Sequence, residues 1–284
     1  MGDERTAWFD GEFLPLADIR LSPMDRGFLF ADGIYEVTAV LDGKLVDSAS
    51  HLARFERSAA ALEIRLPIPI AEIEAIERAL IARNDLARGT VYIQLTRGAA
   101  ERDFLGEPDR PTLILFTQAN DMLASRAPED GVAVITLPDI RWDRRDIKSV
   151  MLLAQVLAKR AAKAAGAQEA WLVEDGYVTE GASSTALIVD ATGRLITRPN
   201  GNAILPGCTR AAILALATRD GVVIEERAFT VAEALAAREA MLTSASTFVH
   251  PIVSIDGRAV GTGRPGPIAR RLRELYIEMA RNSV

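Results

Sequence analysis

Residues 141–210 constrain the fold of this chain more than any other stretch. Apolar segments of strand length and of helical length follow one another there, and short turns of glycine, proline and small residues separate them. This succession is typical of mixed α and β structure. Three candidate polar groups lie within it: Lys148, Glu180 and the segment 206–209.

Lys148 follows the apolar Ile147 and precedes Ser149, where the pattern predicts a helix over 149–165. Most lysines are solvated surface residues, and the charged neighbours of Lys148 suit that interpretation as well. A partly buried amine beside the positive end of a helix is instead a good nucleophile. Lys148 is therefore a candidate catalytic amine.

Glu180 begins a turn of small residues, 181–184, that cannot fill a core. A carboxylate buried at such a place can pair with the protonated pyridine nitrogen of a cofactor. The alternative interpretation is an acid that caps a helix or stabilises a turn.

The segment 206–209 (Pro-Gly-Cys-Thr) precedes a helix expected over 209–218. The backbone N–H groups of a helix start, with the hydroxyl of Thr209, suit a phosphate, although a plain helix cap is more common. The turn 244–247 could close another side of a phosphate, and Arg54 could bind it or form a surface ion pair. An amine, a carboxylate and an anion site are the parts that a pyridoxal phosphate enzyme needs.

The composition excludes several other classes of protein. The net charge is -6 with both signs interspersed, which argues against a nucleic-acid partner. The longest apolar runs are far shorter than the ~20 residues of a membrane-spanning helix. The single cysteine, Cys208, permits no intrachain disulfide and fits a reducing cytoplasm, and two histidines argue against a multi-histidine metal site.

The rest of the chain predicts an α+β fold in two domains. Strands are expected at 34–41, 90–97, 112–117, 132–137, 169–174, 185–189, 195–197, 240–243 and 248–255. Helices are expected at 50–62, 70–84, 149–165, 209–218, 231–237 and 266–282. Because 118–130 lacks clear periodicity, the domains are placed at 1–118 and 126–284, joined by a connection at 119–125. The polar segment 98–111 is long enough to be a binding loop.

Five segments in this order resemble the class IV pyridoxal phosphate aminotransferases: DRGFLFADGIYEV, HLARF, DIKS, VTEGASS and ILPGCTR. The first segment and the loop TRG-x-x-x-R look most like the D-amino acid (D-alanine) aminotransferase branch. The resemblance runs from about Ala7 to Arg271, which is almost the whole chain.

The resemblance implies a fold-type IV architecture, with a smaller N-terminal α/β domain and a larger C-terminal domain that has a β-barrel-like core. It implies a cytoplasmic homodimer that uses pyridoxal 5'-phosphate and moves the amino group of a D-amino acid to a 2-keto acid, 2-oxoglutarate or pyruvate, in a ping-pong reaction.

The resemblance also implies site residues. Lys148 would be the catalytic residue, bonded to the cofactor and moving the proton. The cofactor-binding residues would be Arg54, Lys148, Glu180, Leu205, Gly207, Cys208, Thr209, Ser244 and Ala245. The substrate-binding residues would be Tyr35, Arg102, Phe104 and Ser246. Arg102 would bind the substrate carboxylate from the neighbouring subunit.

Three positions depart from the pattern of the branch. Phe104 stands where a histidine is typical, Ala245 where a threonine is frequent, and Thr185 where an asparagine is common. Phe104 favours an alternative on the same fold, an (R)-selective amine or branched-chain L-amino acid aminotransferase. Aminodeoxychorismate lyase is a second alternative, and a binding protein without catalysis is a third.

Overall fold

The computed structural model describes residues 4–282 of the chain, which divides into two compact units. Unit 1 contains the chain up to Met122, the segment Ile147–Met151 and the chain from Ala280. Unit 2 contains Leu123–Asp146 and Leu152–Met279. The expected domain limits at 118 and 126 flank the change of unit after Met122, and their role as domain limits stays a prediction. The outermost residues of the expected domains, 1–3 and 283–284, lie outside the described residues.

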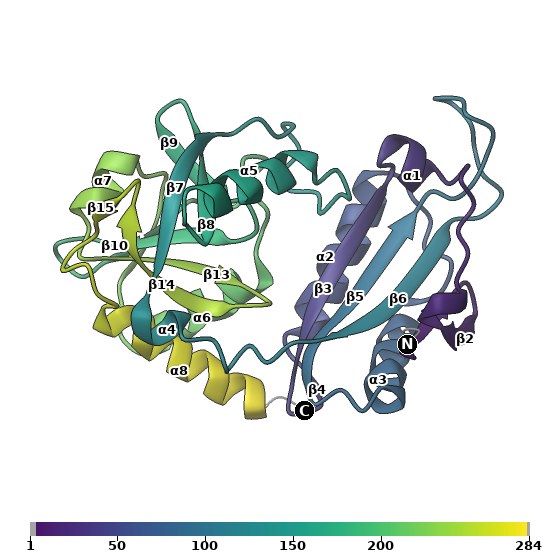
Figure 1. Ribbon diagram of the computed structural model, residues 1–284, viewed down its shortest axis with the longest axis horizontal. Helices are drawn as coiled ribbons and strands as arrows, with labels where there is room; N and C mark the ends of the chain where they lie inside the picture. Colours follow the sequence, from purple (N-terminus) through teal and green to yellow (C-terminus); the bar gives the residue numbers. More distant parts are fainter. Residues whose placement is uncertain (1–3, 283–284) are drawn as a thin grey trace. The chain divides into compact units, whose positions relative to one another are not determined.

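Unit 1 is built on a six-stranded antiparallel sheet in the order β2-β1-β6-β5-β3-β4 (Figure 1). Its strands are β1 (Thr6–Phe9), β2 (Glu12–Pro15), β3 (Gly33–Leu41), β4 (Lys44–Leu45), β5 (Arg88–Thr96) and β6 (Thr112–Ala119). Its helices are α1 (Arg26–Phe30), α2 (Ser48–Ala61) and α3 (Ile70–Arg83), with a 3-10 turn, η1, at Leu16–Asp18.

Buried and half-buried side chains alternate along β3, which shows which face of this sheet is covered by a helix. Ile34, Glu36 and Thr38 are buried, while Tyr35 and Val37 between them are only half-buried. Successive side chains of a strand point to opposite faces, so the even-numbered face is the one against which α2 packs. A carboxylate, Glu36, thus lies on a helix-covered face.

Unit 2 is built on a nine-stranded mixed sheet in the order β12-β11-β10-β13-β14-β7-β8-β9, with β15 paired to β14. Its strands are β7 (Val132–Pro138), β8 (Glu169–Glu174), β9 (Tyr177–Gly181), β10 (Thr185–Val189), β11 (Leu195–Thr197), β12 (Ile224–Glu226), β13 (Glu239–Ser244), β14 (Phe248–Ile255) and β15 (Arg258–Ala259). Its helices are α4 (Ala127–Asp130), α5 (Leu153–Ala164), α6 (Cys208–Arg219), α7 (Val231–Ala236) and α8 (Pro267–Asn282).

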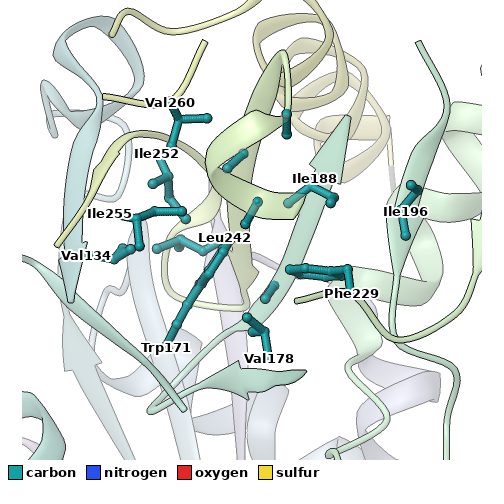
Figure 2. Close-up of a cluster of buried hydrophobic side chains, with 14 of the residues drawn as sticks. Val134, Trp171, Val178, Ile188, Ile196, Phe229, Leu242, Ile252, Ile255 and Val260 are labelled. Atoms are coloured by element: carbon teal, nitrogen blue, oxygen red, sulfur yellow. The ribbon is translucent and has the colours of Figure 1, made fainter. Parts of the chain in front are cut away.

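The sheet of unit 2 curls around a core of buried apolar side chains (Figure 2). Trp171 and Phe229 meet edge to face at its centre, with ring centroids 5.8 Å apart. Val178 on β9 and Leu242 on β13 are buried in the same core. This curled sheet confirms the expected α+β class and barrel-like core.

Most expected elements are present, but the helix predicted over 149–165 begins later than the pattern indicates. It is α5, from Leu153, and the segment Ile147–Met151 is irregular, with an isolated bridge from Ser149 to Ile34 on β3. Glu180 lies near the end of strand β9, directly before the bend of small residues at 182–184. The helix prediction was wrong because backbone pairing with a distant strand, β3, leaves no local pattern around Lys148.

The described residues, 4–282, include no helix that is long and apolar enough to cross a membrane.

Candidate active site

Lys148 lies in the segment Ile147–Met151, which pairs with the start of β3. The Lys148 carbonyl accepts the N–H of Tyr35 at 3.0 Å, and the Val150 N–H donates to the Gly33 carbonyl at 3.0 Å. The half-buried Lys148 Nζ lies 4.3 Å from the centroid of the Tyr35 ring, within the range of a cation–π contact. The structure therefore brings Lys148 and Tyr35 together.

Helix α2 links the backbone of Lys148 to Arg54. The Lys148 N–H donates to Ser58 Oγ at 3.3 Å, and Ser58 lies one helical turn after Arg54. Arg54 pairs bidentately with Glu36, from Nε at 2.6 Å and from Nη2 at 2.8 Å, and His51 Nδ1 lies 2.8 Å from the same carboxylate. Burial alone would raise the pKa of Glu36, but Arg54 and His51 hold this pKa far below its usual range.

Glu180 is buried near the end of β9, where its carboxylate accepts two kinds of donor. One is the guanidinium of Arg141, and the other is the N–H of Leu205, 3.1 and 3.3 Å from the two oxygens. Arg141 also pairs with the buried Asp139 at 2.7 Å, and Thr179 Oγ1 donates to Asp139 at 2.7 Å. Burial raises the pKa of the Glu180 carboxyl, and Arg141 opposes the rise. The carboxylate is thus held in one orientation by a charged network.

The start of α6 carries the three residues expected to bind phosphate. Gly207 is the N-cap residue, and a Cβ there would lie 2.8 Å from Thr185 Oγ1. Cys208 and Thr209 open the helix and are buried. Among the described residues, the buried Thr209 Oγ1 has no hydrogen-bond partner. A buried hydroxyl of this kind next to free helix-start N–H groups suits an anionic ligand.

The second hydroxyl-rich turn, 244–247, joins β13 to β14. Ser244 Oγ lies 2.8 Å from Thr247 Oγ1 and 3.3 Å from Ser246 Oγ. Ser246 is exposed and Ala245 is half-buried. The predicted contacts of Ser244, Ala245 and Ser246 with ligands stay predictions.

Arg102 and Phe104 lie on the segment 97–111 between β5 and β6, called the Arg102 loop below. Phe104 is 76% exposed, and its ring centroid lies 5.3 Å from that of Phe30 on α1. The Arg102 guanidinium carbon lies 5.4 Å from the same ring. The structure brings these two predicted substrate residues together on Phe30, and their contact with substrate stays a prediction.

Two residues that hold the predicted site residues escaped the sequence analysis. Glu36 had a usable signal, because the alternation of Ile34, Glu36 and Thr38 places an acid on a buried face that requires a cation. Arg141 had none, since its bond to Glu180 joins positions 39 residues apart.

Comparison with known proteins identifies the family. The sequence profile of the class IV aminotransferases (Amino-transferase class IV) matches residues 33–255. The E. coli branched-chain amino acid aminotransferase has the same fold, with a TM-score of 0.90 at 23% identity over 98% of this chain and 95% of that one. A hypothetical aminotransferase from Mycobacterium tuberculosis, in its PLP-bound form, gives a TM-score of 0.85 at 26% identity over 97% and 98%.

The chain therefore belongs to the class IV aminotransferase family. Within that family it is similar to D-alanine aminotransferases along almost its whole length. The protein of Staphylococcus epidermidis is 40% identical over 276 residues, which cover 95% of this chain and 97% of that protein. That of Bacillus licheniformis is 36% identical over 93% of each chain.

Proposed function

We propose that the chain is a pyridoxal 5'-phosphate-dependent aminotransferase that moves the amino group of a D-amino acid, such as D-alanine, to 2-oxoglutarate or pyruvate. The observation that carries the proposal is the identity of 36–40% to D-alanine aminotransferases over at least 93% of the chain. The reaction runs in ping-pong order, so the donor leaves as a keto acid before the acceptor binds.

The start of α6 fits the phosphate group of this cofactor. Thr209 Oγ1 is buried and has no hydrogen-bond partner within residues 4–282, so a phosphate oxygen would satisfy it. Gly207 and Cys208 would contribute main-chain N–H groups, which a helix start leaves available to an anion. Arg54, Ser244 and Ala245 complete the proposed phosphate-binding set.

Lys148 is the proposed catalytic residue. When bound, pyridoxal phosphate supplies an electron sink for negative charge at the α-carbon of the donor. Lys148 Nζ would hold the cofactor and would take the α-proton of the donor and return it. The Tyr35 ring and the backbone bonds to β3 hold the amine in place. Glu180, oriented by Arg141 and the Leu205 N–H, would pair with the pyridine nitrogen, and Leu205 would pack against the ring.

Arg102 is the proposed group that binds the donor carboxylate, because a guanidinium binds a carboxylate bidentately. Tyr35 and Ser246 face the donor as well. Phe104 makes the same contact region more apolar than the histidine typical of the branch. This pattern supports small, weakly polar D-amino acids as donors.

We further infer a cytoplasmic homodimer. Leu153, Val156 and Leu157 of α5 are exposed at helical i, i+3 and i+4 spacing, and such an apolar stripe suits a subunit interface. The one cysteine, Cys208, is buried and free, which fits a reducing compartment. Light scattering after size exclusion tests the assembly: we expect twice the chain mass of 30.7 kDa.

A second candidate donor class is favoured by one observation, the apolar Phe104. Rates with D-alanine, L-leucine and (R)-1-phenylethylamine separate the D-amino acid enzyme from a branched-chain L-amino acid or (R)-amine enzyme. Release of pyruvate from aminodeoxychorismate without a keto-acid acceptor would instead indicate a lyase.

The proposed function is tested by Lys148→Ala. We expect turnover to fall by about 10³-fold or more, because the variant lacks the amine that moves the proton. The visible absorbance of the bound cofactor should shift as well. Lys163→Ala, an exposed lysine of α5, is the matched control and should leave both unchanged. Full turnover by Lys148→Ala would exclude the proposed mechanism.

A further inference from the structure

The Arg102 loop, 97–111, is closed at its base against the segment that leads into α1. Ala99 bridges to Asp25, and the Arg26 N–H donates to the Gly98 carbonyl at 2.8 Å. Gly98 has φ +110 and approaches the Arg110 carbonyl so closely that a Cβ would collide with it. The ends of the loop are thus fixed, and its distal part rises beside α1 (Figure 1).

Arg26, the first residue of α1, holds that distal part. Its side chain is buried, and it donates from Nη1 to the Asp103 carbonyl at 2.6 Å and from Nη2 to the Phe104 carbonyl at 3.1 Å. These two carbonyls directly follow Arg102 in the chain. The planar guanidinium therefore fixes the backbone on which the Arg102 side chain is mounted.

Asp32 anchors this guanidinium to the body of unit 1. Arg26 Nε donates to Asp32 at 2.9 Å, and Arg97 Nε donates to the same oxygen at 2.8 Å. Arg97 also donates to the Leu62 carbonyl at 2.6 Å, just after α2. Burial alone would raise the pKa of Asp32, but the two arginines lower it, so the carboxylate stays charged at neutral pH.

Phe30, at the other end of α1, meets the side chains of the loop. The guanidinium carbons of Arg26 and Arg102 lie 4.8 and 5.4 Å from the centroid of its ring, and the Phe104 ring lies 5.3 Å from it. Guanidinium–ring contacts at these distances are favourable. The Phe30 ring thus holds the Arg102 side chain next to Phe104, whose backbone carbonyl is already bound by Arg26.

We propose that Arg26 and Phe30 are positioning residues for Arg102, and through it for the carboxylate of the substrate. The inference rests on the proposed function, because it takes Arg102 as the group that binds the donor carboxylate. It assigns the DRG segment and α1 a role in substrate recognition. It also gives Phe104 a physical role: the phenyl ring contacts Phe30 and helps to hold the loop.

Arg26→Lys tests the clamp, since lysine keeps the charge but cannot donate in a planar fork to two carbonyls and Asp32. For the holoenzyme we expect KM for D-alanine to rise roughly ten-fold while kcat changes little. D-Alaninamide has the same amine and methyl group without the carboxylate, so its kcat/KM should stay near the wild-type value. Arg20→Lys is the matched control, because exposed Arg20 donates to the nearby Ala17 and Ile19 carbonyls and not to the Arg102 loop.

Phe30→Leu and Phe30→Tyr give a second test if Arg26→Lys fails to fold. Leucine removes the ring and should raise KM for D-alanine, whereas tyrosine keeps the ring and should restore it. A wild-type KM in both Arg26→Lys and Phe30→Leu would overturn the inference, and so would equal losses with D-alanine and D-alaninamide. If the enzyme does not turn over D-alaninamide, the kinetics with D-alanine decide: the inference requires a higher KM with little change in kcat. A wild-type enzyme without D-alanine activity would instead contradict the proposed function.

Discussion

The Arg102 loop of unit 1 and the turn 244–247 of unit 2 are each held by a buried arginine that donates to backbone carbonyls. In unit 1 the arginine is Arg26, which is paired with Asp32. In unit 2 it is Arg273 on α8, whose pKa burial lowers while Glu129 opposes the change. The Arg102 loop is long, and its distal part is exposed. The turn 244–247 is short, and the next residue, Phe248, is buried in the core.

Backbone strain accompanies the turn of unit 2. Arg273 Nη1 donates to the carbonyls of Thr247 and Val249 at 2.8 and 3.1 Å, on either side of Phe248. Phe248 has φ 61, which costs a bulky residue about 1–3 kcal/mol, and its fully buried ring packs at 5.1 Å against Tyr276. Buried aromatic packing therefore adds to the Arg273 hydrogen bonds at this turn, whereas the Phe104 ring of the Arg102 loop is mostly exposed. Loss of Arg273 should mainly cost stability, and changes at the Arg102 loop should mainly affect substrate binding.

The largest expected effect is that of Arg273→Met. The substitution removes the Arg273 hydrogen bonds to the carbonyls of Thr247 and Val249 beside a strained residue, and we expect the free energy of unfolding to fall by about 4 kcal/mol. Urea denaturation measures it. Arg270→Met, on the exposed side of the same helix, should lie within about 0.5 kcal/mol of wild type. An Arg273→Met protein as stable as this control would remove the contrast between the two regions.

Glu77 on α3 is a contrast to Asp32, whose pKa two arginines lower. Glu77 is a buried acid of unit 1 whose oxygens have no hydrogen-bond partner among residues 4–282. Burial raises its pKa to about 7, against the opposing effects of Thr38 and His51. The native protein then binds a proton that the unfolded chain loses above about pH 4.3, so stability falls as pH rises towards 7.

Glu77→Gln removes this titration. Relative to wild type, the variant should gain about 3 kcal/mol of unfolding free energy between pH 4 and pH 8. Denaturation at a series of pH values measures the gain, and exposed Glu72→Gln should show none. A pH-independent difference between Glu77→Gln and wild type would mean that Glu77 does not titrate in this range.

The effect of Asp32→Asn on stability should depend on pH in the opposite sense to that of Glu77→Gln. The arginines lower the pKa of Asp32 in the folded protein, so its stabilisation is present above the unfolded pKa and is lost as pH falls through the folded one. We expect a loss of about 2 kcal/mol at pH 7 and a higher KM for D-alanine. The difference from wild type should shrink below about pH 4. Exposed Asp18→Asn is the control, and a loss that is the same at every pH would contradict the ion-pair explanation.

The smallest expected effect is that of Phe104→Leu. The ring is mostly exposed, and an aromatic pair is worth about 1 kcal/mol, so unfolding should change by less than that. KM for D-alanine should rise by about three-fold or less. Steady-state kinetics beside urea denaturation measure both. A large loss of stability with unchanged KM would place Phe104 in the core of the fold rather than in the loop clamp.

Elements with a strong local pattern could be predicted from the sequence. Strands β8, β10 and β11 have the expected bounds. Their alternation of side chains and their turn dipeptides are contained within a few residues. The order of the motifs then indicated the family, which the comparison confirmed.

The contacts that hold the site could not be predicted in this way. Arg26 reaches carbonyls 77 and 78 residues away, and Lys148 pairs with β3 more than a hundred residues before it. The sequence around Lys148 resembles a helix start, because pairing with a distant strand is not encoded in neighbouring residues. Among these contacts, only the ion pair of Arg54 with Glu36 had a signal in the sequence, because Glu36 alternates with Ile34 and Thr38 on one face of a strand.

The handedness of the donor tests the central claim most directly. Purified holoenzyme, mixed in single turnover with D-alanine or with L-alanine, is followed by the pyruvate that it releases. A D-amino acid aminotransferase should release about one pyruvate per active site with D-alanine at a rate at least about 10²-fold above that with L-alanine. Equal rates, or a faster reaction with L-alanine, would contradict the proposed function.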